Sequence, residues 1–228
     1  MLLLKHGIGK EYRMKLSYTE IFRYSDMLNP VSPTTLLLAG KLAQLGPEKT
    51  VLDLGSGKGY PSLLWASVFG VRVEGFDLNR NFVRYANSRA VMLNLSSRVE
   101  YICRDVKEVR LGRKYDVVAS LGLGVARVYG SYGGALRVFK NMLDKDGVLV
   151  FAEHVWLTRP VPPKVLSALG ESEGNLVTQP EMHELFREYG FKKLGDFASS
   201  KEDWEIYVRP TYVALQEMIE RESRLEDE

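Results

Sequence analysis

A glycine-rich stretch at residues 50–59, T-V-L-D-L-G-S-G-K-G, constrains the fold of this chain more than any other feature. Its first half is apolar, as in a buried parallel strand, and Gly55, Gly57 and Gly59 then allow a tight turn without Cβ clashes. Pro61 follows in the first turn of an expected helix, where a missing N–H costs nothing. A strand, a glycine loop and a helix N-terminus in succession indicate a site for a nucleotide-like ligand, because N–H groups and the helix dipole converge there.

The spacing of the glycines argues against two common nucleotide sites. The dinucleotide fingerprint is G-x-G-x-x-G, whereas the third glycine here comes one residue early, and a P-loop requires G-x-x-x-x-G-K-[ST]. Asp53 lies two residues before the first glycine. Its carboxylate would repel a pyrophosphate and attract an ammonium group. The sequence therefore predicts a ligand that carries a cation near this loop.

The segment Asp53–Gly59 resembles the D/E-x-G-x-G-x-G signature of class I S-adenosylmethionine (SAM) methyltransferases. Two later acidic residues fall where that family has them. Asp77 follows a second expected strand at 71–76, and Asp105 follows a third at 99–104. The resemblance covers about residues 47–197. More loosely, the chain is similar to a bacterial subgroup of small, functionally uncharacterised SAM methyltransferases, and the residues that carry this similarity are Asn29–Pro30, Ala152–Glu153 with Trp156, Gln179–Pro180, and Trp204 with Tyr207.

Strand and helix patterns alternate from Thr50 onwards at the rhythm of βαβ units. We therefore expect an α/β fold with a Rossmann-like, doubly wound, mostly parallel sheet of the class I methyltransferase type. The expected helices are 61–69, 80–95 and 134–143, and the later strands are 115–122, 148–152 and 191–197. A turn is expected at 144–147. The family's sheet usually finishes with an antiparallel C-terminal strand, for which the sequence shows no recognisable candidate.

Three segments are expected: an N-terminal helical lid at 1–46, a SAM-binding domain at 47–200, and a C-terminal helix at 201–228. Within the first segment, the pattern predicts a helix over 11–27. A second helix begins after the Ser32 cap, with Pro33 in its first turn, and ends at Gly46. By the resemblance, Tyr24 and Asn29 would help to cover the cofactor; packing or capping is the alternative role.

Each strand end on the loop side provides a residue for the cofactor. Asp77 comes 22 residues after Gly55, close to the spacing of about 20 at which an acid reaches ribose hydroxyls, although it could instead cap the next helix. Asp105 would accept a hydrogen bond from the adenine amino group, or cap a turn. The cofactor-binding set that the resemblance implies is Asp53, Gly55, Ser56, Gly57, Gly59, Asp77, Leu78, Asp105, Val106 and Ser120.

Residues after the fourth and fifth strands are candidates for the acceptor site. The glycine-dense loop 122–134 is expected to be a mobile lid, whose Tyr129 and Tyr132 could place π-faces near a sulfonium or could anchor the loop. Glu153 or His154 could take a proton from the nucleophile, or Glu153 could hold an ammonium group of the acceptor.

Three aromatic residues complete the candidate acceptor site. Trp156 would face the acceptor. Trp204 and Tyr207 lie one helical turn apart and would either close over the acceptor or pack onto the sheet. No spacing of His, Cys, Asp or Glu resembles a metal site, and His183 is expected to be a solvated helix residue.

Composition limits the classes of partner and compartment. The 31 basic and 29 acidic side chains form no clustered basic footprint for nucleic acid. The lone Cys103 excludes an internal disulfide and is expected to be a small core side chain. No signal-peptide core and no run of about 20 apolar residues is present. We expect a cytoplasmic protein that does not enter a membrane.

The sequence thus predicts a SAM-dependent methyltransferase that acts on a small molecule. Methyl transfer from a sulfonium is an in-line displacement whose leaving group needs no protonation, so alignment of the reacting atoms suffices. The alternatives are an RNA or protein methyltransferase and a non-catalytic SAM-binding subunit, with a nicotinamide dehydrogenase disfavoured by the glycine spacing. A homo-oligomer could form through an exposed edge of the sheet.

Overall fold

The computed structural model describes residues 3–6, 10–13, 17–109, 112–170 and 172–226. The chain divides into two compact units. Residues 31–198 form the core unit, and residues 1–30 together with 199–228 form the terminal unit. None of the helices in the described ranges is long and apolar enough to cross a membrane.

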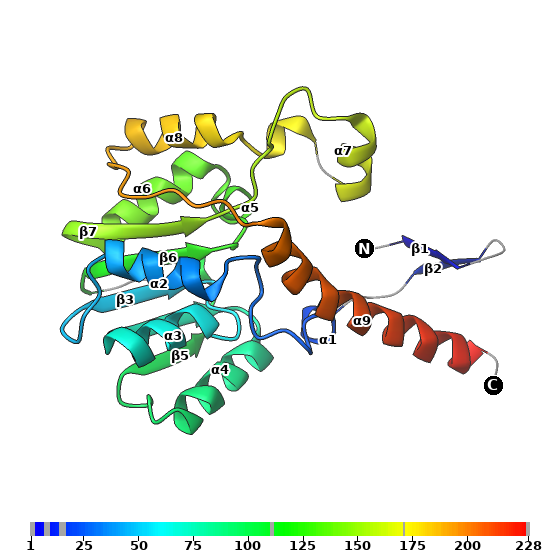
Figure 1. Ribbon diagram of the computed structural model, residues 1–228, viewed down its shortest axis with the longest axis horizontal. Coiled ribbons are helices and arrows are strands. Elements are labelled where there is room, and N and C mark those ends of the chain that lie inside the picture. Colours follow the sequence, from blue (N-terminus) through cyan, green and yellow to red (C-terminus); the bar gives the residue numbers. More distant parts are fainter. Residues whose placement is uncertain (1–2, 7–9, 14–16, 110–111, 171, 227–228) are drawn as a thin grey trace. The chain divides into compact units, whose positions relative to one another are not determined.

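The core unit is built on a five-stranded parallel sheet with the spatial order β5-β4-β3-β6-β7 (Figure 1). Its strands are β3 (Thr50–Leu54), β4 (Arg72–Asp77), β5 (Val99–Cys103), β6 (Tyr115–Leu121) and β7 (Leu143–Ala152). The chain order reverses between β3 and β6, and ligands of such sheets bind at this point, outside the carboxyl ends of the strands. The predicted Rossmann-like α/β fold is confirmed.

Helices cover this sheet, and the central strands β3 and β6 are almost wholly buried, as doubly wound sheets require. The helices are α2 (Pro33–Leu42), α3 (Tyr60–Phe69), α4 (Arg80–Met92), α5 (Val125–Tyr129), α6 (Tyr132–Met142), α7 (Pro163–Leu169) and α8 (Gln179–Glu188). Figure 1 shows α6 and α8 together beside β7, and α4 beside β5.

Capping residues explain most of the helix boundaries that the sequence predicts. The Ser32 hydroxyl accepts a hydrogen bond from Thr35 N at 3.2 Å, and Gly70 ends α3 in the left-handed conformation. Thr178 and Glu181 form a complete capping box at the start of α8. Two helix ends come earlier than predicted: α2 ends at Leu42 and α4 at Met92, and Gln44 and Asn94, with φ of 52° and 57°, reverse the chain there.

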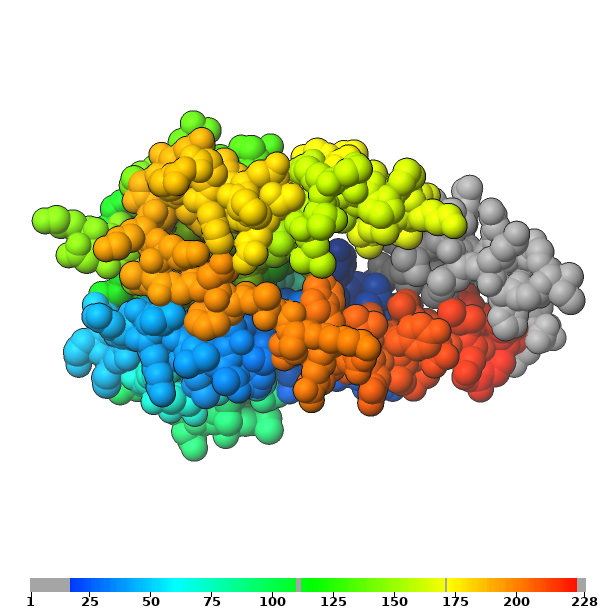
Figure 2. All heavy atoms as spheres, turned by 45° about the horizontal axis from the view of Figure 1, so that its top comes forward, coloured from blue at the N-terminus to red at the C-terminus, as the bar shows by residue number. Residues whose placement is uncertain are grey.

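The sixth strand predicted at residues 191–197 is absent. Phe191 packs on Phe186 of α8 with ring centroids 6.2 Å apart, and Asp196 accepts from Gln179 Nε2 at 3.0 Å and pairs with His183 at 2.8 Å. These contacts tie the segment to α8, at the surface shown in orange in Figure 2. Within the described residues the sheet therefore ends at β7, with neither a sixth strand nor the family's antiparallel strand. His183 is partly solvated, as expected, and its Nε2 also contacts Asp196 Oδ2.

Two smaller expectations also change. Residues 144–147 belong to β7 as an irregular stretch, since Leu143 pairs with Tyr115 and Val148 with Val117. Cys103 is exposed, because β5 is an edge strand whose last residue reaches the surface, and its thiol contacts Leu78 O at 3.6 Å.

The terminal unit contains an antiparallel pair, β1 (Leu3–His6) and β2 (Lys10–Arg13), and the helices α1 (Tyr18–Ile21) and α9 (Lys201–Glu226). The helix predicted over 11–27 is wrong, because its described residues form part of β2 and only one turn of helix. Phe22 stacks on Tyr207 at 6.2 Å, and Tyr24 donates to Glu217 at 2.9 Å. These contacts hold the end of α1 against α9.

The close packing of the sheet can be tested at Gly75 in β4. A Cβ at this position would lie 2.4 Å from Cδ1 of the Tyr101 side chain, which is 3% exposed and cannot move freely. We expect Gly75→Ala to lower the unfolding free energy in urea by about 1–3 kcal/mol. Gly46→Ala is the matched control, since nothing lies within 4 Å of its added Cβ. Equal stability of the two variants would contradict this packing.

Candidate active site

The glycine loop between β3 and α3 has the backbone conformation that its sequence requires. Gly55, Gly57 and Gly59 have φ angles of 73°, 53° and 76°, a region that side chains rarely allow. The amides of Gly55 and Ser56 both donate to Phe76 O, at 2.8 and 3.0 Å. The loop is therefore held against the end of β4, and its following residues enter the N-terminus of α3.

Asp77 pins the same loop from the carboxyl end of β4. Its Oδ2 accepts from Gly57 N at 2.8 Å and its Oδ1 from Asn79 N at 2.8 Å. Burial raises the pKa of this carboxyl group, and the two backbone hydrogen bonds oppose the rise. Asn79 itself caps α4 through Asn81 N and Phe82 N, so Asp77 is not the cap. Each Asp77 oxygen retains a lone pair that can accept a hydroxyl.

Asp53 lies beneath the loop, with only 2% of its surface exposed. Ser62 Oγ, in the first turn of α3, donates to Asp53 Oδ2 at 2.7 Å. Burial raises the pKa of Asp53 to about 6, while the Ser62 hydrogen bond opposes the rise and the nearby charge of Asp77 adds to it. The carboxylate is surrounded by protein, so the direct ammonium contact expected from the sequence stays a prediction.

The other cofactor candidates divide into exposed and buried residues. Leu78 is 72% exposed beside Asp77 and offers an apolar surface. Ser56 and Ser120 are buried, and neither hydroxyl has a hydrogen-bond partner among the described residues. Asp105 caps a 3-10 turn through Lys107 N at 2.9 Å, and Val106 behind it is 6% exposed. The adenine contact of Asp105 stays a prediction beside this observed capping.

The loop 122–134, predicted to be a mobile lid, is largely helical. Glu153 Oε1, directly after β7, accepts from Gly124 N at 2.8 Å and from Val125 N at 3.1 Å, and so caps α5. Burial raises the pKa of Glu153, and these hydrogen bonds oppose the rise. Tyr129 meets Phe139 edge to face at 5.5 Å, and its buried hydroxyl has no partner among the described residues. The glycines start and end short helices here.

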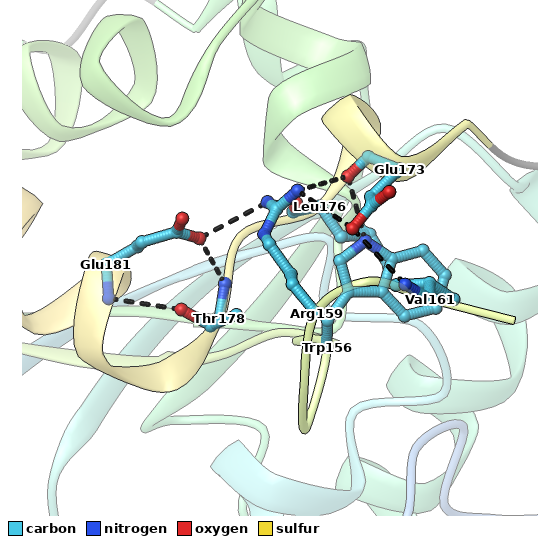
Figure 3. A network of polar contacts seen from close by, with 7 residues as sticks. All are labelled: Trp156, Arg159, Val161, Glu173, Leu176, Thr178 and Glu181. Atoms are coloured by element: carbon cyan, nitrogen blue, oxygen red, sulfur yellow. Dashed lines mark hydrogen bonds and ion pairs between the residues drawn. The ribbon is translucent and has the colours of Figure 1, made fainter.

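His154 and Trp156 follow Glu153 but differ from each other. His154 is exposed at one side, although the protein around it lowers the imidazole pKa by desolvation. Trp156 is 7% exposed and donates from Nε1 to Glu173 O at 3.0 Å. Figure 3 shows Arg159 beside it, bonded to the carbonyls of Glu173 and Leu176. Trp156 therefore anchors the segment that carries α7, and an acceptor contact stays a prediction.

The remaining aromatic candidates, Trp204 and Tyr207, lie in the terminal unit on one face of α9. Their rings meet edge to face at 6.0 Å, and Tyr207 also stacks on Phe22. The spacing that the sequence predicts on this helix face is confirmed, while the acceptor role is untested.

Sequence reasoning missed two residues that support the loop. Tyr101 on β5 and Ser62 on α3 are buried beside Asp53, with their hydroxyl oxygens 2.9 Å apart. Ser62 could have been noticed because it follows the glycines within one helical turn. Tyr101 carried no signal, because its partners are distant in sequence. In the described ranges, no group of three or more His, Cys, Asp or Glu side chains could hold a metal ion.

Because Glu153 caps α5, substitutions of Glu153 should lower the stability of the protein by different amounts. Glu153→Ala leaves the amides of Gly124 and Val125 without their acceptor, and we expect a loss of about 1–2 kcal/mol in unfolding free energy. Glu153→Gln retains a side-chain oxygen and should lose less than half of that amount. Urea unfolding of both variants measures the difference, and equal losses would show that the acceptor oxygen is unimportant.

The buried carboxyl group of Asp53 should make the unfolding free energy of the protein depend on pH. Its folded-state pKa is raised to about 6, so the folded protein binds the proton more tightly than the unfolded chain does. The stability that Asp53 contributes is present at low pH and is lost as the pH rises from about 4 to about 6. The stability of Asp53→Asn relative to wild type should therefore rise by roughly 2–3 kcal/mol between pH 4 and pH 7.5 in urea unfolding. The exposed Asp146→Asn should show no such trend.

The chain is similar to methyltransferases in sequence and in structure. Residues 51–147 match the family described as "Methyltransferase domain". The uncharacterised protein YjhP of Escherichia coli is 26% identical over 193 residues, which are 84% of this chain and 77% of that protein. The X-ray structure of YjhP superposes with a TM-score of 0.82 at 25% identity, over 89% of this chain and 82% of that chain.

Two further relatives carry methyltransferase names. A SAM-dependent methyltransferase from Thiobacillus denitrificans, solved with S-adenosyl-L-homocysteine, gives a TM-score of 0.82 at 24% identity, over 91% of this chain and 84% of that chain. Malonyl-(acyl-carrier protein) O-methyltransferase of Acetivibrio thermocellus is 32% identical over 109 residues, which are 47% of this chain and 36% of that protein. The resemblance seen in the sequence is thus confirmed: residues 51–147 match a methyltransferase-domain family, and the fold is the Rossmann-like fold of the solved SAM-dependent methyltransferases.

Proposed function

We propose that this protein transfers a methyl group from SAM to a small-molecule acceptor. One observation carries the proposal: at the switch point of the sheet, the Asp77 carboxylate is bonded to Gly57 N in a loop of three left-handed glycines. An acid and a glycine loop in contact at this edge are suited to a nucleoside whose ribose and charged tail lie side by side.

The residues at this edge fit each part of SAM. The N–H groups at the start of α3 suit its carboxylate, and Asp77 can accept from its ribose hydroxyls. Exposed Leu78 offers apolar surface to the adenine, and Asp105 at the end of β5 offers an acceptor to the adenine amino group. The buried hydroxyls of Ser56 and Ser120 would support the loop and strand around these contacts.

The chain's own contribution to the reaction is alignment and, where the acceptor is protonated, removal of a proton. SAM supplies a methyl group on a sulfonium leaving group. We infer that the fixed loop and the capped helix α5 keep the reacting groups in line, and alignment of this kind can supply a large part of the acceleration. His154 has a lowered pKa and is therefore a neutral imidazole at neutral pH, so it can accept a proton. Glu153 contributes by holding α5 and remains a second candidate base.

A small acceptor is supported by the charge balance. The 31 basic and 29 acidic side chains give the chain little attraction for a polyanion. Tyr129 and Trp156 are the proposed acceptor contacts of the core unit, and Trp204 and Tyr207 are separate candidates in the terminal unit. The second candidate is a macromolecular acceptor, which the name of the Acetivibrio relative favours, since its malonyl group is attached to a carrier protein.

A cytoplasmic location and self-association are further parts of the proposal. The exposed thiol of Cys103 suits a reducing compartment. Strand β7 has no described strand on its outer side, and an edge of this kind can pair with a second copy.

Transfer of labelled methyl groups tests the acceptor class. Purified protein and methyl-labelled SAM would be incubated with a bacterial extract separated into small molecules, RNA and protein. We expect label in the small-molecule fraction only. Label in RNA or protein would replace the proposed acceptor class. Absence of transfer to every fraction, with SAM still bound, would favour a non-catalytic SAM-binding subunit.

Calorimetric titration tests the cofactor site. Wild type should bind SAM and S-adenosylhomocysteine and should not bind NAD. We expect Asp77→Ala to weaken binding of S-adenosylhomocysteine by at least tenfold, because it removes about two charged-acceptor hydrogen bonds. Glu100→Ala, an exposed acid on the neighbouring strand, is the control and should bind like wild type. Binding of NAD instead would refute the cofactor assignment.

A further inference from the structure

Tyr101 reaches from β5 under the neighbouring strand to the glycine loop. It is 3% exposed, and its hydroxyl donates to Gly59 O at 3.2 Å and lies 2.9 Å from Ser62 Oγ. Gly59 is both the third glycine of the loop and the N-cap of α3. A hydroxyl from two strands away therefore contacts the last backbone position before the helix that faces the ligand.

The ring of Tyr101 also explains why two positions are glycine. An added Cβ at Gly59 would lie 2.7 Å from Tyr101 Cζ, and one at Gly75 would lie 2.4 Å from Tyr101 Cδ1. Both distances are far inside van der Waals contact. Tyr101 thus fills the space that the missing side chains leave, and it supports the loop from below.

The hydroxyls of Tyr101 and Ser62 connect this support to Asp53. Ser62 Oγ lies 2.7 Å from Asp53 Oδ2 and 3.3 Å from Gly59 O. When Asp53 is ionised, the single Ser62 proton points to the carboxylate, and Tyr101 can donate to Ser62 or to Gly59. When Asp53 is protonated, it can donate to Ser62, whose own proton then turns to Gly59 O. The direction of the hydrogen bonds therefore depends on one proton.

We propose that Tyr101 is a positioning residue of the cofactor site: with Ser62 it links Asp53 to the Gly59 carbonyl, so that ligand binding at the glycine loop depends on the proton at Asp53. The inference rests on the proposed function, because the ligand is taken to be SAM or S-adenosylhomocysteine. Tyr101 and Ser62 are not proposed to contact the ligand. They act on it through the glycine loop, which is proposed to bind it.

The sign of the pH dependence follows from the groups around Asp53. Ser62 from α3, Asp77 from β4 and Tyr101 from β5 face it, and buried Lys58 lies in the loop with its Nζ 4.7 Å from the Tyr85 ring centroid. The ligand brings an ammonium group near these carboxylates, which favours the ionised form of Asp53. Affinity should therefore rise as the pH increases through the range in which Asp53 loses its proton.

The test is calorimetric titration with S-adenosylhomocysteine from pH 5.5 to pH 8 on wild type and three variants. At pH 7.5, Tyr101→Phe should weaken binding about tenfold, as expected for loss of one well-placed hydrogen bond in a connected network. In Ser62→Ala the pH at which affinity rises should move upward, because the donor that stabilises ionised Asp53 is gone. If Tyr101→Phe does not fold, the pH profile of Ser62→Ala still tests the inference.

Tyr115→Phe is the matched control. Tyr115 is 1% exposed on β6, and its hydroxyl bonds to Arg113 Nε at 3.1 Å and to Glu74. It should lose a similar amount of thermal stability and keep wild-type affinity and pH profile. Equal effects of Tyr101→Phe and Tyr115→Phe, or an unchanged pH profile in Ser62→Ala, would overturn the inference. Failure of wild type to bind S-adenosylhomocysteine at any pH would overturn the proposed function itself, which is a different result.

Discussion

The glycine loop holds its shape because the last two residues of β4 accept hydrogen bonds from its backbone. Phe76 O accepts from the first two amides of the loop, and the Asp77 carboxylate accepts from the third position. A loop of left-handed glycines has high conformational entropy in the unfolded chain, so these contacts must offset a larger ordering cost than usual. Every later feature of the site, from the start of α3 to the cap of α4, is placed relative to this fixed loop.

Buried carboxylates give the site its chemical character. Asp53 and Asp77 lie close enough for the charge of one to raise the pKa of the other, and burial raises both. Two acids that resist ionisation next to each other are relieved by a ligand with a positive charge. On the proposed function, this gives a physical reason for two costly acids at the glycine loop: the stability that they cost in the free protein favours binding of a cation.

The sequence predicted the features that depend on local rules. Periodicity located the strands, Ser32 and Thr178 marked helix starts, and the glycine spacing identified the loop. Prediction was wrong where a tertiary contact decided the outcome. Residues 191–197 were predicted to form a strand, but the ring of Phe191 packs on Phe186 of α8. At residues 122–134 the glycines suggested a loop, whereas the carboxylate of Glu153, 29 positions from Gly124, caps a helix there.

Within the site, sequence spacing indicated the residues that are proposed to border the ligand and missed those that support them. Asp77 is recognisable because its distance from the loop is set by one βα unit. Tyr101 and Ser62 are recognisable only when three neighbouring elements are in place, since 39 positions separate them along the chain. Support of this kind is three-dimensional, so a single sequence does not reveal it.

A crystal structure of the protein with S-adenosylhomocysteine tests the central claim most directly. The account predicts the ligand along the carboxyl ends of β3, β4 and β5, with its ribose hydroxyls on Asp77 and its amino acid portion on the glycine loop. Ligand density at any other place, or at this edge with Asp77 making no contact to the ribose, would contradict it.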